Sequence, residues 1–441
     1  MASLLAGLAL TQLAVTAADA QAPAKEAQQP AAGVPAEPGK TLTNPKANAA
    51  PSPGQRPTPA MTRASYDPVA FREVPGWEAD DHLAALKAFL ASCPRLVAAG
   101  RAATKGGEPR TPVELRAACE AALALPEKLT RVEARAFFER HFLPHRVVHE
   151  QMNGLVTGYY EPLLEGSRKR EGKFQTPILK RPADLVTVIP ETKGAVAGGL
   201  THARRTAAGL VPFATRAEIE AGALGGQSLE LIYLTDPVEK FFLQIQGSGR
   251  IRLTDGTTVR VHYDGKNGHP FTSIGRYLID KGLFAADRMS MGALGRWLKT
   301  DVERARLVMN QNASYVFFRE LPSDAGGPLG AIEVPLIAGR SLAVDPAIHT
   351  LGSPVYVSAP TLTPTGHTRP FSRLMVAHDV GSAIRGPERG DIYFGSGESA
   401  GRIAGTTKHA GNFFVLLATA NPASAPKAGG KQALAPERQP R

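Results

Sequence analysis

From about residue 150 onward, the chain consists of short runs of β-branched and aromatic residues separated by glycine, proline, asparagine and aspartate. Such runs are typical of strands, and the residues between them are those that tight turns require. The 44 glycines and 36 prolines also favour turn-rich β structure over a helical bundle. We therefore predict a mainly β fold after residue 150, with strands in GLVTGYY, LELIYL, KFFLQIQG, TTVRVHY, SYVFFRE, SPVYVSA, RLMVAHD and NFFVLLAT.

The segment before residue 150 has the apolar spacing of helices instead. WEADDHLAALKAFLASC places its leucines and Cys93 on one helical face. TPVELRAACEAALAL predicts a second helix, with Pro112 near its start. TRVEARAFFERHF predicts a third, because Thr130 and Glu133 have the spacing of a capping box. The sequence thus predicts an N-terminal helical part, and one later helix in SMGALGRWLKTDVERARLVMN.

The two ends of the chain have compositions that do not favour a folded core. Residues 1–20 form an apolar run ending in Ala18-Asp19-Ala20, the small-x-small pattern of a signal-peptidase site. Residues 21–65 are rich in alanine, proline, glutamine and lysine, so we expect a disordered linker, and residues 421–441 resemble it as a tail. No cysteine lies near the cleavage site and no later run is long enough to cross a bilayer, so neither a lipid anchor nor a transmembrane segment is predicted.

Cys93 and Cys119 are the two cysteines of the sequence. In an exported protein such a pair is a disulfide candidate that would join the first two helices, although two buried free thiols are the alternative. The formal net charge of +11 suits a polyanionic partner. Cell wall and nucleic acid are both polyanionic, and a merely solvated basic surface with no such partner is the alternative. The charge alone therefore does not identify a partner.

Several common catalytic and metal signatures are absent from the sequence. It contains no H-E-x-x-H, no Walker loop and no dinucleotide-binding G-x-G-x-x-G after a strand. The cysteines are too few for a zinc cluster, and a lone pair such as His378-Asp379 is more often structural than metal-binding. We therefore predict no cofactor and no metal.

Polar and aromatic residues at the ends of several predicted strands are candidates for sugar binding. Tyrosines suit this role because the ring stacks on a sugar face while the hydroxyl forms hydrogen bonds, yet core tyrosines at a domain boundary are an equal alternative. The alternation in FFLQIQGSGRI would place two glutamines on one strand face, or on a polar outer face before a hairpin. The candidates are Thr157, Tyr159, Tyr160, Glu161, Gln244, Gln246, Ser248, Gly249, Asn312 and Asp345.

The stretch VAHDVGSAIRGPERGDIYFGSG holds Asp379 and Asp391 in a glycine-rich setting between β-prone residues. Spacing alone favours a turn with two solvated aspartates. Five other stretches support a functional role for it. The six stretches together resemble the membrane-bound lytic murein transglycosylase A family over residues 70–418. The other five are TGYYEP, FFLQIQGSGRIRL, YDGKNGHPFTSIGRYL, NASYVFFRE and AVDPAIHTLGSPVYV.

The resemblance implies a double-psi β-barrel with a second, smaller β domain inserted into it. Residues 66–164 would hold the helices and the start of the barrel, 165–310 the inserted domain, and 311–420 the rest of the barrel with a three-aspartate module. A groove between the domains would bind the glycan strand, with QIQGSG facing it. Members named as membrane-bound carry a lipidated N-terminal cysteine that this sequence lacks. The resemblance therefore implies a periplasmic, monomeric enzyme, peripheral at the outer membrane.

The family reaction cleaves the β-1,4 bond between N-acetylmuramic acid and N-acetylglucosamine and leaves a 1,6-anhydro end. The resemblance maps the three aspartates onto Asp345, Asp379 and Asp391, with Asp391 as the catalytic acid and base and Asp379 as its support. One carboxyl suffices because the C6 hydroxyl of the sugar is the nucleophile. An unperturbed aspartate is ionised at neutral pH, so we expect burial and a neighbouring charge to raise the pKa of Asp391.

Two other functions fit the same residues. An inverting glycoside hydrolase would use Asp379 as the base that activates a water, with the two carboxyls about 6.5–9.5 Å apart. A non-catalytic wall-binding barrel protein would need neither carboxyl for its function. Nucleic-acid binding rests on the charge alone, because no recognition motif supports it. The sequence therefore predicts peptidoglycan glycan strands, and no nucleic acid, as the partner.

Overall fold

The computed structural model describes residues 64–101, 111–150, 154–188, 200–322, 326–363 and 370–420. The predicted signal peptide and C-terminal tail lie outside these ranges, and so does the predicted linker apart from its last two residues. Among the described residues, no helix is long and apolar enough to span a bilayer.

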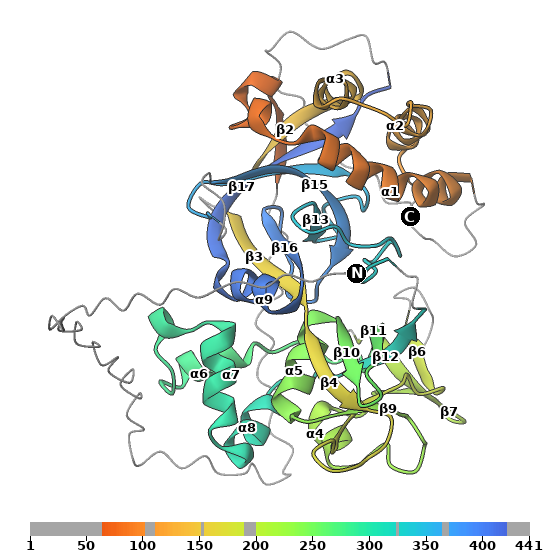
Figure 1. Cartoon of the computed structure of the whole chain (residues 1–441), viewed down its shortest axis with the longest axis vertical. Coiled ribbons are helices and arrows are strands. Elements are labelled where there is room, and N and C mark those ends of the chain that lie inside the picture. The colour runs from red at the N-terminus through yellow and green to blue at the C-terminus, as the bar shows by residue number, and fades with distance from the viewer. Residues whose placement is uncertain are drawn as a thin grey trace, which may run out of the picture. The chain divides into compact units, whose positions relative to one another are not determined.

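A closed β-barrel combines strands from before and after the inserted part (Figure 1). Its sheet has the order β1-β2-β17-β14-β15-β13-β16-β3, and a further pairing of β17 with β3 closes it. This arrangement confirms the predicted mainly β class. The strands are β1 (Ser65–Pro68), β2 (Phe142–Val148), β3 (Gly154–Glu161), β13 (Ser341–Val344), β14 (Pro354–Ala359), β15 (Phe371–Val380), β16 (Arg389–Ser396) and β17 (Lys408–Ala418).

Three N-terminal helices cover one side of the barrel, as the sequence predicts: α1 (His82–Arg101), α2 (Val113–Leu123) and α3 (Arg131–His141). Thr130 caps α3 through the predicted capping box with Glu133. Buried aromatic and aliphatic side chains of these helices share a core with residues of β14, β15 and β17. Two short 3-10 helices, η1 (Phe71–Glu73) and η2 (Trp77–Ala79), lead into α1.

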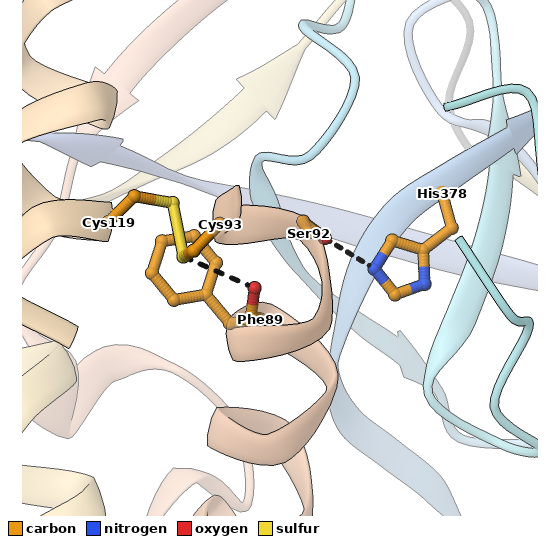
Figure 2. Close-up of a disulfide and its surroundings, with 5 residues drawn as sticks. All are labelled: Phe89, Ser92, Cys93, Cys119 and His378. Carbon is orange, nitrogen blue, oxygen red and sulfur yellow. Dashed lines mark hydrogen bonds between the residues drawn. A yellow bond between two sulfur atoms is a disulfide. The ribbon is translucent and has the colours of Figure 1, made fainter. Parts of the chain in front are cut away.

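The predicted disulfide between Cys93 and Cys119 is present and joins α1 to α2 (Figure 2). Figure 2 also shows that the preceding residue, Ser92, reaches the barrel, where its hydroxyl lies 2.7 Å from Nε2 of His378. The other ring nitrogen of His378 lies 2.7 Å from the Ser341 hydroxyl. Because His378 directly precedes Asp379 on β15, the helical part is hydrogen-bonded to the strand that carries that aspartate.

Replacing both cysteines, Cys93→Ala with Cys119→Ala, should lower the free energy of unfolding by about 3.5 kcal/mol through the added entropy of the unfolded chain. This magnitude follows from the 26-residue separation of the two cysteines. Urea denaturation of the wild type and the double variant measures it, provided that both have the same m-value. Equal midpoints would contradict the prediction.

A second sheet, of order β12-β11-β10-β4-β9-β5, forms the core of the inserted part. A small three-stranded sheet, five α-helices and one 3-10 helix accompany it within the described residues. The bounds are β4 (Leu163–Ser167), β5 (Thr176–Leu179), β6 (Leu185–Thr187), β7 (His202–Thr206), β8 (Gly209–Val211), α4 (Arg216–Glu220), β9 (Glu230–Leu234), α5 (Pro237–Gln246), β10 (Ser248–Leu253), β11 (Thr258–Lys266), α6 (Ile274–Asp280), η3 (Ala286–Arg288), α7 (Met291–Lys299), α8 (Val302–Met309) and β12 (Val316–Leu321). This sheet thus begins in β4, just before the predicted boundary at 165, and ends in β12, beyond the boundary at 310.

One predicted strand is wrong, because KFFLQIQG belongs to helix α5. Asp236 caps the helix by accepting a hydrogen bond from the Val238 amide, and Pro237 occupies the first turn. Gly247 ends it with a left-handed backbone, φ +78°. The apolar residues also fit a helical face, so the two glutamines do not lie side by side on a strand.

One predicted helix is two helices in the structure. The single helix expected in SMGALGRWLKTDVERARLVMN is two helices, α7 and α8, because Asp301 interrupts it and caps α8 through the Arg304 amide. Helix α9 (Gly397–Thr406), which begins directly after β16, was not predicted. Its glycine content hides the helical pattern, and it packs against β3 and β16 beside the aspartates described next.

Candidate active site

Strand β13 separates the two aspartates of the glycine-rich stretch. In the sheet register, Ala343 of β13 pairs with Asp379 of β15 on one side and with Asp391 of β16 on the other. Because neighbouring strands lie about 4.8 Å apart, the two Cα atoms are roughly 10 Å apart. The aspartates are therefore strand residues, and the glycine-rich loop of residues 381–388 connects their strands.

The two carboxylate oxygens of Asp391 differ in their hydrogen bonding. The Thr157 hydroxyl, on the adjacent strand β3, donates a hydrogen bond of 2.6 Å to Oδ1. The other oxygen, Oδ2, takes no hydrogen bond from any residue that the structure describes. Asp391 lines a cavity, so this oxygen is the free position at which a carboxyl can carry a proton.

Asp379 differs because donors reach both of its oxygens. The Tyr159 hydroxyl donates to Oδ2 at 2.9 Å, while the amides of Ala331 and Val380 donate to Oδ1 at 3.1 and 2.9 Å. These donors hold the Asp379 carboxyl in place beside the same cavity.

The environment raises the pKa of both carboxyls. Burial raises the pKa of Asp391, and the Thr157 hydroxyl and the Arg389 charge oppose the increase only partly. Burial likewise raises the pKa of Asp379 to about 6; its three hydrogen bonds lower it and the charge of Asp391 raises it. Repulsion between two carboxylates is mutual, so the pair favours one retained proton.

Both aspartates open into a cavity of about 950 Å³ whose wall comes from the barrel and from the inserted part. Tyr159 lies on the barrel side and Ser248 on the inserted side. The predicted residues Gln244, Gln246 and Asn312 also line it. The structure therefore brings together seven predicted site residues: Asp379, Asp391, Tyr159, Gln244, Gln246, Ser248 and Asn312.

The amide side chains in the wall also support the surrounding backbone. Gln244 accepts a hydrogen bond from Arg216 at 2.6 Å and donates one to the Val316 carbonyl at 3.0 Å. Gln246 accepts one from the Tyr160 amide at 3.0 Å, which links the inserted part to β3. These contacts restrict the amides, so the groups that face the cavity are pre-positioned.

Five predicted residues do not line this cavity. Thr157 lies behind Asp391, which it holds. Tyr160 lines a separate hollow between α5, α7 and α9. Gly249 is packed so closely that a Cβ would lie 2.5 Å from Leu243. The remaining two are Glu161 and Asp345.

Asp345 holds the loop that precedes Asp391. Its carboxylate accepts a hydrogen bond from the Gly386 amide at 2.9 Å and lies 3.4 Å from Arg385. Glu388 anchors the other end of the loop by accepting a hydrogen bond from the Phe413 amide at 2.8 Å. Asp345 is thus placed to position the loop, and it does not line the cavity.

Glu161 is fully buried where β3 leaves the barrel. Its carboxylate lies 2.6 Å from Arg260 and 3.4 Å from Arg250, and it accepts a hydrogen bond of 2.6 Å from Ser396. Ser396 belongs to the barrel and the two arginines to the inserted sheet, so Glu161 connects the two parts.

Replacing Glu161 with glutamine should lower the free energy of unfolding by about 2–3 kcal/mol, because two arginines lose their counter-charge. The value is below that of a fully buried pair since the Arg250 side chain is 35% exposed. Thermal unfolding measures the change, with Glu398→Gln, on the exposed surface of α9, as the control. A variant as stable as the wild type would contradict this role.

Sequence reasoning missed the cationic residues of the cavity. Arg389 faces it because it lies two residues before Asp391 on the same strand, which period-two alternation predicts. Lys266, Arg319 and Arg385 come from three different stretches of the resemblance, but nothing in those stretches singles them out. Within the described ranges, no three histidine, cysteine, aspartate or glutamate residues are grouped to hold a metal ion.

Comparisons with known proteins match both parts of the chain. A family model described as the MltA specific insert domain matches residues 155–319, and one described as the 3D domain matches residues 340–417. Membrane-bound lytic murein transglycosylase A of Escherichia coli K12 is 37% identical over 268 residues, which are 60% of this chain and 66% of that protein. The Vibrio cholerae protein of that name is 33% identical over 294 residues, 66% of this chain and 71% of its own length.

Solved structures agree with the sequence matches. A membrane-bound lytic murein transglycosylase from Agrobacterium tumefaciens has a TM-score of 0.72 and 37% identity, covering 80% of this chain and 98% of its own. Escherichia coli MltA with bound chitohexaose has a TM-score of 0.56 and 29% identity, covering 81% and 92%. The barrel, its inserted domain and the shared cavity thus define a class of murein-cleaving enzymes. Within that class, the chain belongs to the membrane-bound lytic murein transglycosylase A family.

Proposed function

We propose that this protein cleaves the β-1,4 bond between N-acetylmuramic acid and N-acetylglucosamine in peptidoglycan and leaves a 1,6-anhydro end. The observation that carries the proposal is the Asp391 carboxyl, whose raised pKa and open Oδ2 suit a proton donor facing the cavity. The related Escherichia coli protein binds chitohexaose, a β-1,4-linked sugar chain, which supports a glycan strand as the occupant here.

In the first step, protonated Asp391 donates its proton to the oxygen of the scissile bond as the bond to C1 breaks. The leaving N-acetylglucosamine departs as an alcohol, and Asp391 becomes a carboxylate. The Thr157 hydroxyl and the positive charge of Arg389 stabilise that carboxylate, since both favour the charged form.

In the second step, the C6 hydroxyl of the same N-acetylmuramic acid attacks C1. Asp391 takes the C6 proton, so the carboxyl returns to its starting state and no water is consumed. One residue performs both transfers because the donor in the first step is the acceptor in the second. Asp379 maintains the proton on Asp391 in the free enzyme through charge repulsion.

The pH dependence of kcat/KM should show a loss of activity on the alkaline side. The donor must be protonated, and a raised carboxyl pKa extends the protonated form to higher pH than for an ordinary aspartate. We expect activity to fall about tenfold per pH unit once the pH exceeds the raised pKa of Asp391. A rate that is flat from pH 5 to 9 would rule out this proton donor.

The reaction is tested with purified murein sacculi, whose turbidity falls as glycan strands are cut. The purified protein should clear sacculi without added metal or cofactor. A protein that binds sacculi in a pull-down assay but never clears them would instead support the non-catalytic wall-binding function.

We also propose that the protein acts as a monomer in the periplasm, peripheral to the outer membrane. Two features support this location: the signal-like residues 1–20 and the membrane-bound relatives of the family. Cell fractionation and light scattering of the purified protein test the two parts. Recovery in the cytoplasmic fraction, or a dimer mass, would contradict them.

A further inference from the structure

Two cations face the catalytic cavity from opposite parts of the protein. Lys266 lies at the end of β11 in the inserted part, and Arg385 lies in the loop that connects the two aspartate strands. The Lys266 ammonium donates a hydrogen bond of 3.3 Å to the Ser382 hydroxyl in that same loop. Lys266 and Arg385 therefore approach each other across the cavity.

The charges of these two cations are only partly compensated by carboxylates. Among the described residues, no carboxylate lies within 4 Å of the Lys266 ammonium. Arg385 has a single carboxylate neighbour, Asp345 at 3.4 Å, and its side chain is 61% exposed. The positive charge of Arg385 adds to burial in lowering the pKa of Lys266, which places both in one electrostatic field.

The other acidic residues of the wall already have partners. Asp264 lies 3.7 Å from Arg319, and Glu333 lies 2.8 Å from Arg95. Asp379 accepts hydrogen bonds from Tyr159, Ala331 and Val380, and Asp391 accepts one from Thr157. The cavity therefore has excess positive charge around Lys266 and Arg385, where an anion would relieve the repulsion between them.

We propose that Lys266 and Arg385 form a carboxylate-binding site that selects murein over neutral β-1,4 glycans. This inference rests on the proposed function and specifies its substrate. Murein carries carboxylates on the lactyl group of N-acetylmuramic acid or on the peptide joined to it, whereas N-acetylglucosamine polymers carry none. A guanidinium and an ammonium are the usual partners of such groups, and Ser382 supplies a further donor.

The experiment measures binding in the Asp391→Asn background, so its result does not depend on the reaction. Three ligands are compared by calorimetry: peptide-bearing murein oligosaccharides, the same oligosaccharides after removal of the peptide, and chitohexaose. The test variant combines Lys266→Gln and Arg385→Gln. The matched control combines Lys281→Gln and Arg306→Gln, which remove two charges from exposed positions of the inserted part away from the cavity.

We expect the test variant to bind peptide-bearing murein roughly 10–100-fold more weakly, as loss of charge-assisted hydrogen bonds predicts. Its affinity for chitohexaose should stay within twofold of the parent, and the control should match the parent throughout. A loss confined to the peptide-bearing ligand identifies the peptide carboxylate. A loss confined to the peptide-free ligand identifies the lactyl carboxylate, which is free only after the amide bond to the peptide is cleaved, and a loss for both ligands shows that the site accepts either group.

Unchanged affinity for both murein ligands, or an equal loss for chitohexaose, would overturn the proposal. Failure of the proposed function is a separate outcome, because it would appear in the products of the wild type and not in these affinities. Thermal unfolding of each variant verifies that the fold is intact.

Discussion

The Asp391→Asn variant should bind murein as the wild type does and cleave it about 10³–10⁴-fold more slowly. Asparagine keeps the size of the side chain and can still accept the Thr157 hydrogen bond, but it has no proton to give to the leaving oxygen. The variant also removes the acceptor of the C6 proton, so both steps are affected. Release of soluble muropeptides from sacculi measures the loss.

The matched control is Asp255→Asn, an aspartate in an exposed turn where it bonds to Thr257. This variant should release muropeptides at the rate of the wild type. If Asp391→Asn clears murein as fast as the control does, Asp391 is not the proton donor.

The Asp379→Asn variant should be more stable than the wild type and yet less active. Burial raises the pKa of Asp379 from 3.8 to about 6 in the folded protein, so folding must overcome the cost of its charge at neutral pH. Removing the charge should stabilise the protein at pH 7.5 by about 1–3 kcal/mol, because the carboxyl is mostly buried. Urea denaturation measures the gain.

The pH dependence of this gain follows from the direction of the shift. A carboxyl with a raised folded pKa destabilises the protein above its unfolded pKa of 3.8, increasingly until the pH passes 6. The stabilisation by Asp379→Asn should therefore disappear near pH 3. The alkaline limb of activity should also move to lower pH, because Asp391 loses a repelling charge. A variant less stable than the wild type at pH 7.5 would refute this account.

Local signals explain which parts of the fold could be predicted. The capping box at Thr130 and the spacing of apolar residues define the N-terminal helices within the sequence itself. Cys93 and Cys119 lie on two of those helices, so the disulfide followed from the same pattern and the expected export. The resemblance to a family placed the barrel and its inserted domain, which local patterns alone do not reveal.

The errors arise where tertiary contacts decide. KFFLQIQG contains β-prone residues, but the cap at Asp236 and the left-handed Gly247 favour a helix over residues 237–246. The two aspartates lie on either side of β13, a strand that precedes both of them in the chain, so their relative positions depend on the sheet order. Lys266 and Arg385 are more than 100 positions apart, so only the folded chain places them in one cavity.

Mass analysis of the muropeptides released by the wild-type protein tests the central claim most directly. If the C6 hydroxyl is the nucleophile and Asp391 returns its proton, every new end is a 1,6-anhydro sugar, one water lighter than a reducing end. Reducing ends of full mass would show instead that water attacks C1, as in an inverting hydrolase with Asp379 as the base. That result would contradict the single-carboxyl mechanism.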